Sequence, residues 1–318
     1  MNINAQIAKT YIVTNKKLTG VAVAGVVLGM SIYIFMNSML MGFDKSSSKS
    51  IFKSSPHIRV YKDDEISKPL VNNNGKQMLL SNPKIVPSKN TIINPAQVIA
   101  SIQSMKDVQI VTAQVNANIF YNSGKSQITG ICSGINPEEA DRMYSISSTI
   151  VEGNLEALKG NPNGILIGSG VSEKMSLRVN DYVNITSSKG VNKAFKIVGI
   201  FKTSNSVIDK SKSYVNILAA QQLLKEGNVY VTDINVNISN PDDAEKIATL
   251  IAARTNYKAE GWKQANETLM AAQRMRKIII TFVSTTILVV AGFGFYNILN
   301  ITITQKIHDI AILKAMGF

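Results

Sequence analysis

LTGVAVAGVVLGMSIYIFMNSMLMGF, residues 18–43, is a run of 26 residues without a charged side chain, and it decides how the rest of the chain is interpreted. A second uncharged run, IIITFVSTTILVVAGFGFYNILNITITQ, covers residues 278–305 near the other end. A helix rises about 1.5 Å per residue, so each run reaches about 40 Å, more than the roughly 30 Å hydrocarbon core of a bilayer. Two transmembrane helices are therefore predicted.

About 230 residues of mixed, polar-rich sequence separate the two runs, enough for a separate hydrophobic core. Alternating apolar and polar residues predict strands, for example over residues 108–121 and 232–238. Asn-Pro pairs predict helix starts before residues 95–105 and 241–255, with Asn94 and Asn240 as N-caps. The predicted fold class is a membrane protein whose helical spans carry a large α+β domain.

These patterns divide the chain into an N-terminal segment, a first span, the α+β domain, a second span and an amphipathic C-terminal segment. The predicted bounds are 1–17, 18–43, 44–273, 274–305 and 306–318. Neither Pro nor Gly interrupts the helical pattern between Ala265 and Gly292, so one continuous helix is expected to enter the second span. The chain stops at Phe318 directly after an apolar motif, and we expect it to be a piece of a longer protein.

The chain is basic, with a net charge of +13 from 34 Lys and Arg against 21 Asp and Glu. The lysines are scattered among Ser and Asn and form no basic stripe interleaved with aromatic residues, so nucleic acid is not an expected partner. Basic residues also flank the spans, where they would meet lipid head groups. They are Lys45, Lys49, Lys53, Arg274, Arg276 and Lys277. Because Lys9, Lys16 and Lys17 precede the first span, charge alone leaves the orientation open.

The sequence offers no catalytic or metal-binding constellation. Cys132 is the only cysteine, which excludes an internal disulfide, and we expect it to be a small core residue. The two histidines, His57 and His308, are far apart in sequence. Gly168 to Lys174 reads GSGVSEK, which lacks the second glycine of a phosphate-binding P-loop. No cofactor, no metal and no enzymatic activity are therefore expected of this chain.

The second half of the first span is rich in large, adaptable apolar side chains. These are Phe35, Met36, Met39, Met41 and Phe43. Methionine is flexible and polarizable, so such a surface suits varied apolar ligands, and packing against lipid or another helix is the alternative. Gly25 and Gly29 lie four residues apart, a spacing that either allows a second helix to approach closely or is incidental.

Several blocks together resemble a known family. The segment NGILIGSG (163–170) is followed by Glu173-Lys174 and by LRVND (177–181), then by the strand FKIVGIF (195–201), by Trp262 with Asn266, and by DIAILKAMGF (309–318). In order and spacing these blocks resemble ABC-transporter permeases of the MacB/LolC/LolE (FtsX-like) type. MGF (41–43) and GINPE (134–138) resemble motifs of the lipoprotein-releasing branch of this family.

The resemblance implies four spans per protomer, both termini of this chain in the cytoplasm, and a central domain outside the bacterial inner membrane. It also implies a dimer of permease protomers with a separate ATPase subunit, and mechanical transmission of ATP-driven closure through the long helices. The C-terminal segment would then dock the ATPase. The residues expected to couple are Lys306, Asp309, Ile310, Leu313, Lys314 and Met316.

The function implied is ATP-driven extraction of lipoproteins from the membrane, with the methionine-rich surface contacting acyl chains and a periplasmic carrier or adaptor as a further partner. Alternatives stay open. In the branch member that recruits the carrier, a long hook interrupts a hairpin, whereas here only residues 187–190 connect the two strands. The chain is then a partner-type subunit, a homodimeric variant or a MacB-like exporter of peptides or macrolide-like molecules. Two interpretations outside transport are a non-transporting regulator of cell-wall enzymes and a two-span sensor.

Overall fold

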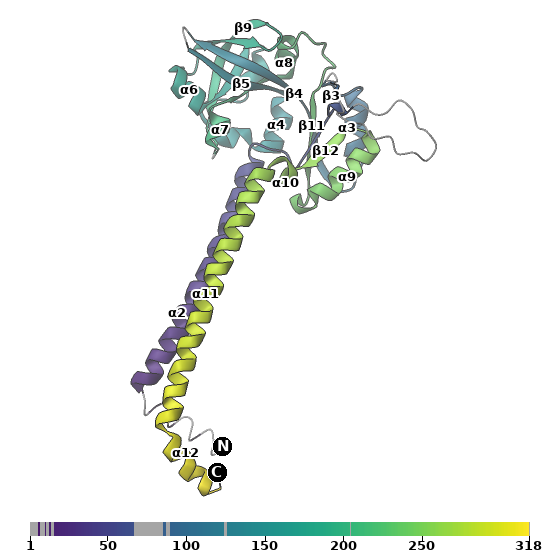
Figure 1. The fold of residues 1–318 in the computed structure, drawn as a ribbon. Helices are drawn as coiled ribbons and strands as arrows, with labels where there is room; N and C mark the ends of the chain where they lie inside the picture. The colour runs from purple at the N-terminus through teal and green to yellow at the C-terminus, as the bar shows by residue number, and fades with distance from the viewer. Residues whose placement is uncertain are drawn as a thin grey trace, which may run out of the picture. The chain divides into compact units, whose positions relative to one another are not determined.

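The computed structural model describes residues 6, 10, 13, 16–66, 85–86, 90–123, 126–203 and 205–317. It divides into a helical unit, residues 1–47 with 268–318, and an α+β unit, residues 48–267 (Figure 1). Most of the predicted N-terminal segment 1–17 lies outside the described residues. So do residues 67–84 and 87–89, which belong to a stretch between residues 62 and 95 whose many Asn, Lys, Ser and Pro residues predict little regular structure.

Two long helices form the helical unit. Helix α2 covers Lys16–Phe52 and helix α11 covers Glu267–Gln305, and each contains a stretch long and apolar enough to cross a membrane. They run antiparallel in one register, because Gly29 faces Ala291 and the Asp44 carboxylate pairs with Arg276 at 3.1 Å. A Cβ atom at Gly29 would lie 2.7 Å from the Cβ of Ala291, so glycine is required for this close approach.

The helices extend beyond the uncharged runs. The polar residues 44–55 predict a helix extension or a linker, and in the structure residues 44–52 continue α2 to Phe52. The expected continuous helix begins at Glu267, two residues later than Ala265, because a short helix α10, Trp262–Ala265, ends at Asn266. The Asn266 amide donates to the carbonyl of Trp262 at 2.8 Å and closes this turn. After Gln305 the chain bends at Lys306 into helix α12, Ile307–Ala315.

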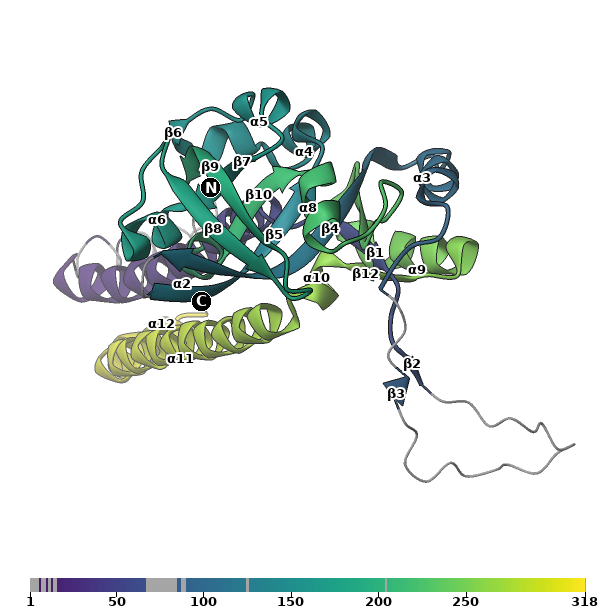
Figure 2. The same cartoon turned by 90° about the horizontal axis from the view of Figure 1, so that it is seen from above.

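A closed ring of six strands forms the core of the α+β unit. In ring order they are β4 (Val108–Ser123), β5 (Ser126–Ile135), β10 (Lys212–Asn216), β7 (Gly164–Gly168), β9 (Asn192–Phe201) and β8 (Tyr182–Ser187) (Figure 2). The ring closes because β8 pairs with both β9 and β4. Strand β6, Ile150–Gly153, adds to β9 outside the ring.

Side chains at alternate positions of β4 fill the interior of this barrel. Val115, Ala117, Ile119 and Tyr121 are buried there, as the period of two in a strand requires. Helices α6 (Ser169–Met175) and α8 (Ile217–Leu223) contribute to the same core. A second cluster packs outside the ring, beneath α4 (Pro137–Tyr144), the turn of helix η1 (Ile146–Thr149) and α5 (Ala157–Gly160).

The expectation that Cys132 is a core residue is confirmed, since the thiol is fully buried in the barrel. Burial raises the pKa of Cys132 to about 12, so at pH 8 only about one thiol in ten thousand is ionised. We expect a thiol reagent such as Ellman's reagent to leave the native protein unmodified for hours and to label one thiol per chain in denaturant. Rapid labelling of the native chain would contradict a closed barrel.

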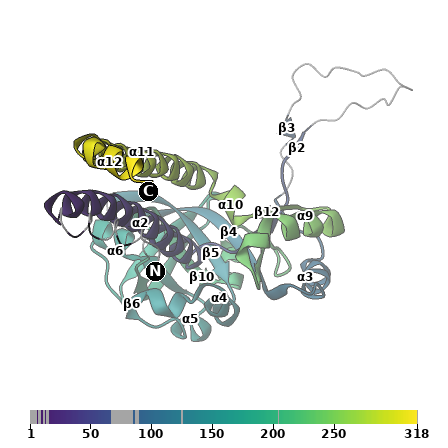
Figure 3. The same cartoon turned by 90° about the horizontal axis from the view of Figure 1, so that it is seen from below.

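The first half of β4 leaves the barrel and enters a second, antiparallel sheet. Its other strands are β11 (Asp233–Ile238), β1 (Ile58–Tyr61) and β12 (Lys258–Gly261), in that order. Helices α3 (Pro95–Gln103) and α9 (Ala244–Thr255) lie over this sheet (Figure 3). Strands β2 (Glu65–Ile66) and β3 (Ile85–Val86) form a separate two-stranded antiparallel sheet.

Helix ends test the predicted caps. Asn240 accepts from the backbone N–H of Asp242, as predicted, although the first turn is a 3-10 helix, η2, Pro241–Asp243. Asn94 is the N-cap of α3, as predicted, but its side chain accepts no hydrogen bond from the helix. Its backbone is left-handed, with φ 49°, and the carbonyl rather than the side chain accepts from the first turn.

Residues 218–226 predict a helix with Gly227 as its C-cap, but the helix in the structure ends earlier. Helix α8 stops at Leu223, and Lys225, not Gly227, adopts the left-handed conformation, with φ 56°. The Gln221 amide explains this early end, because it donates to the carbonyls of Asn228 and Tyr230, both at 2.9 Å. This buried side chain fixes the segment after the helix in place of a C-cap glycine.

Candidate functional site

The predicted acyl-chain residues lie on the described part of α2. Phe35, Met39 and Phe43 follow one another at four-residue spacing and expose much of their surface along one face. Met36 is half-buried beside this face, and Met41 is exposed on a different face of the helix. The guanidinium of Arg276 stacks over the Phe43 ring at 3.8 Å, so Phe43 already has a partner in α11.

The predicted coupling residues lie in and around α12. Lys306 precedes the helix, Lys314 lies in its last turn, and Met316 follows it as an exposed residue. The backbones of Asp309, Ile310 and Leu313 are helical, and their side chains lie outside the described part of the structure. The helical backbone thus gives the segment a spacing at which residues 310 and 313 share a face.

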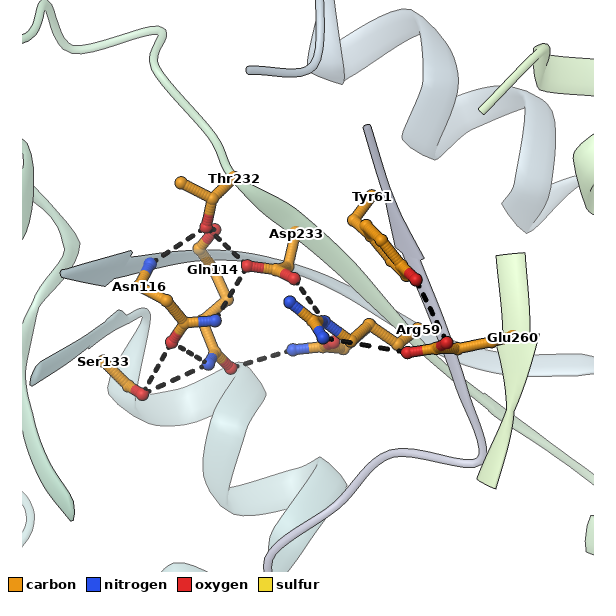
Figure 4. Close-up of polar contacts among 9 residues, drawn as sticks. Arg59, Tyr61, Gln114, Asn116, Ser133, Thr232, Asp233 and Glu260 are labelled. Atoms are coloured by element: carbon orange, nitrogen blue, oxygen red, sulfur yellow. Dashed lines mark hydrogen bonds and ion pairs between the residues drawn. The ribbon is translucent and has the colours of Figure 1, made fainter. Parts of the chain in front are cut away.

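A polar cluster that sequence analysis did not identify lies where the barrel and the second sheet share β4 (Figure 4). Its centre is Asp233 at the start of β11, whose side chain is only 2% exposed. One carboxylate oxygen accepts from the Arg59 guanidinium at 2.5 Å. The other accepts from the Asn116 amide at 2.7 Å and from the Thr232 hydroxyl at 2.5 Å.

Amides and a hydroxyl continue the cluster along the face of the sheet. Gln114 donates to the Asn116 carbonyl oxygen at 2.7 Å and to the Ser133 hydroxyl at 3.2 Å. Ser133 in turn donates to Asn116 at 2.8 Å, and Asn235 donates to Gln114 at 2.8 Å. Each of these bonds joins different strands or alternate residues of one strand, so the cluster fixes how β4, β5 and β11 meet.

Arg59 supplies the counter-charge of Asp233 at the edge of the cluster. Burial opposes the charge on Arg59, but the attraction and hydrogen bond of Asp233 prevail and raise the pKa of the guanidinium above its ordinary value. Arg59 also lies 3.7 Å from Glu260 on β12, and Glu260 accepts from the Tyr61 hydroxyl at 3.1 Å. The side chain of Arg59 remains 43% exposed, so it presents part of its charge to solvent.

The cluster forms one wall of a groove with a volume of about 820 Å³. Apolar side chains and lysines also line the groove. Its lining includes Arg59, Lys62, Gln114, Asn116, Asn118, Ile131, Ser133, Ser188, Lys189, Val207, Lys212, Glu226 and Asp233. Its volume is in the range of sites that bind small molecules or short segments.

His57 lies next to β1 and contacts Phe52, whose ring in turn contacts Trp262. Its ring meets Phe52 at 4.6 Å, and Phe52 meets Trp262 at 5.0 Å. The Trp262 backbone N–H donates to the carbonyl of His57 at 2.9 Å. Phe52, the last residue of α2, and Trp262, the first residue of α10, therefore pack together within the α+β unit.

Burial lowers the pKa of His57 below its ordinary value, and a hydrogen bond with the backbone of Ile238 only partly opposes this shift. His57 therefore binds a proton more readily in the unfolded chain than in the folded protein. The contribution of the neutral imidazole to the free energy of unfolding is present above about pH 6.5 and is lost as the pH falls through the lowered pKa of the folded state. We expect the thermal midpoint to drop by a few degrees between pH 7.5 and 5.5. A His57→Gln variant should lose this dependence and His308→Gln should keep it; an unchanged dependence in His57→Gln would contradict the assignment.

Comparison with known proteins decides the family. Residues 19–254 match the model of the MacB-like periplasmic core domain, which covers most of the chain. The chain belongs to this family. The MacB-like match begins within α2 and ends in α9, so it includes the barrel and three of the four strands of the second sheet, β4, β11 and β1, but not β12. The polar cluster around Asp233 therefore lies inside the matched domain.

Curated relatives extend the match to nearly the whole chain. The lipoprotein-releasing system transmembrane protein LolC of Neisseria meningitidis is 24% identical over 314 residues, covering 94% of this chain and 69% of LolC. LolE of Haemophilus influenzae is 18% identical over 308 residues, covering 92% and 68%. The periplasmic region of MacB from Actinobacillus actinomycetemcomitans aligns with 69% of this chain and 95% of its own, at 12% identity and a TM-score of 0.40.

Proposed function

We propose that this chain is a permease subunit of an ATP-driven ABC transporter that extracts lipoproteins from the bacterial inner membrane for release to a carrier. The observation that carries the proposal is the match to LolC over 94% of the chain, across both apolar helices and the domain between them. Relatives named as permeases and the MacB-like domain support the broader assignment to ABC transporter permeases.

The proposed substrate explains why energy is needed. Removing an acyl chain from lipid costs about 0.8 kcal/mol per methylene, so a chain of 14 methylenes costs about 11 kcal/mol. The exposed face of Phe35, Met39 and Phe43, with Met36 and Met41 beside it, would offer the chain an apolar surface during removal. The sequence contains no P-loop, so we assign ATP hydrolysis to a separate subunit.

We assign the transmission of motion to α11. This single helix of 39 residues begins at Glu267, directly after the Trp262–Asn266 turn of the α+β unit. A continuous helix is stiff along its length, so a displacement at one end moves the other. In the proposed topology both ends of the chain are cytoplasmic, the α+β unit is extracytoplasmic, and α12 contacts the ATPase. A second permease protomer and membrane lipids complete the proposed assembly.

The test is purification of the permease from bacterial membranes with its bound proteins and lipids identified by mass spectrometry, followed by reconstitution in proteoliposomes. We expect an ATPase subunit and triacylated proteins to copurify, and ATP to release a labelled lipoprotein to a soluble acceptor. An ATPase together with an outer-membrane channel or adaptor, and no lipoprotein, would overturn lipoprotein release.

A MacB-like export function is the second candidate, because one observation favours it. Strands β8 and β9 are joined by a tight turn, in which the N–H of Ser187 donates to the carbonyl of Val191 at 2.8 Å. No long insertion interrupts this described hairpin, as the sequence predicted. A permease without a hook at this site would need another way to recruit a carrier, whereas an exporter with an adaptor would not.

A further inference from the structure

We propose that the groove beside the Asp233 cluster binds an extended, acidic polypeptide segment. The inference deepens the proposed function, on which it rests, because the water-exposed tether of a membrane-anchored protein would be such a segment. Three properties of the groove carry it: a row of side-chain amides, exposed aliphatic side chains and an excess of positive charge.

The amides lie in a row on one face of β4. Gln114, Asn116 and Asn118 occupy alternate positions, so their side chains project to the same side of the strand. Gln114 and Asn116 are held by the cluster, whereas the Asn118 amide is exposed and makes no hydrogen bond to a described residue. A carboxamide both donates and accepts, which matches the alternating C=O and N–H groups of a peptide backbone.

Aliphatic side chains face the same space. Val207 on α7, Ser206–Asp209, is 74% exposed, and Ile131 on β5 is 44% exposed. Ile131 lies in register with Asn118 on β4 and with Lys212 on β10, so apolar, amide and cationic groups are neighbours. Burying such aliphatic side chains under a ligand is favourable by about 25 cal/mol per Å² of apolar surface.

The charges favour an acidic partner. Four cations, Arg59, Lys62, Lys189 and Lys212, line the groove against two carboxylates. One carboxylate, Asp233, is already engaged by Arg59. Lys62 and Lys189 form no ion pair with a described residue. The Lys212 ammonium lies 3.5 Å from the Ser54 carbonyl and near the Tyr214 ring, and pairs with no carboxylate among the described residues. Acidic side chains would gain these cations as partners on binding.

A polypeptide fits these features better than a lipid head group or a sugar. A head group supplies a phosphate but neither backbone amides nor aliphatic side chains. A sugar supplies hydroxyl groups but no negative charge. An extended segment presents backbone amides continuously and alternates its side chains, so acidic residues can reach the lysines while apolar ones cover Val207 and Ile131.

The test measures binding of a fluorescent 12-residue peptide of aspartate, serine, asparagine and leucine to the full chain in detergent micelles. We expect the Lys189→Glu/Lys212→Glu double variant to weaken binding at least tenfold. Lys246→Glu, an exposed α9 lysine outside the groove, should bind like the parent protein. A peptide with lysine in place of aspartate should bind at least tenfold more weakly.

The proposal would be overturned if the acidic and the lysine-containing peptide bound equally, or if the double variant bound the acidic peptide as tightly as the parent protein does. Displacement of the peptide by glycerophosphate at equal concentration would also overturn it, because it would identify a phosphate site. Trp262 fluorescence during unfolding verifies that the double variant is folded. Because this assay contains neither ATPase nor lipoprotein, failed lipoprotein release with intact peptide binding would refute the proposed function alone. Lost peptide binding with intact release would refute the groove alone.

Discussion

Replacing Asp233 by alanine is expected to lower the free energy of unfolding of the α+β unit by about 2–3 kcal/mol. The carboxylate is 2% exposed and accepts hydrogen bonds from Arg59, Asn116 and Thr232. Its removal deprives the half-buried Asn116 amide of its acceptor and the Arg59 guanidinium of its closest counter-charge, whereas the Thr232 hydroxyl can still donate to the Gln114 carbonyl. The loss lies below the 3–5 kcal/mol typical of a fully buried pair, because Arg59 is 43% exposed and water can solvate it.

Denaturant unfolding followed by the fluorescence of Trp262, the only tryptophan, measures this loss. Asp242→Ala is the matched control, because Asp242 pairs with Lys263 at 2.9 Å while 79% exposed, and its removal should not change the unfolding free energy measurably. Asp233→Asn should fall between the two, since it keeps an acceptor and loses the charge. Equal stability of Asp233→Ala and the parent protein would show that the cluster does not hold the sheets together.

The local sequence pattern was sufficient to predict those strands and helices whose conformation follows from their own residues. Residues 108–121 alternate because their odd-numbered members enter the barrel core from Val115 onward, so the pattern predicted β4 to within two residues. The two uncharged runs likewise predicted the apolar helices α2 and α11. Periodicity carries this information because burial of one face acts residue by residue.

Features that depend on pairing between strands distant in sequence could not be predicted from local sequence patterns. Strand β12 is Lys-Ala-Glu-Gly, without a β-branched residue, and it is extended because it pairs with β1, about 200 positions earlier. The Asp233 cluster joins Arg59, Asn116 and Asp233 from three distant strands, so no local motif marks it. The one signal available was the repetition of amides at alternate positions of β4, at Gln114, Asn116 and Asn118.

The second large effect is expected in α12. Leu313→Asp should uncouple ATP hydrolysis from transport in the assembled transporter, because a charged side chain would replace an apolar one on the face we assign to the ATPase groove. That face follows the helical spacing of Ile310, Leu313 and Met316. Loss of one central apolar contact of an interface costs about 2 kcal/mol, which corresponds to a roughly 30-fold weaker affinity for the ATPase.

Ile312→Asp is the matched control for this experiment. It makes the same chemical change one residue earlier, about 100° around the helix, at a side chain that is 52% exposed. If the apolar face docks the ATPase, Leu313→Asp lowers substrate-stimulated ATPase activity and copurification at least tenfold, and Ile312→Asp retains both. Equal loss in the two variants would show that α12 needs only to be apolar, as a helix anchored at a membrane surface would. Full coupling in Leu313→Asp would show that α12 does not dock the ATPase through this face.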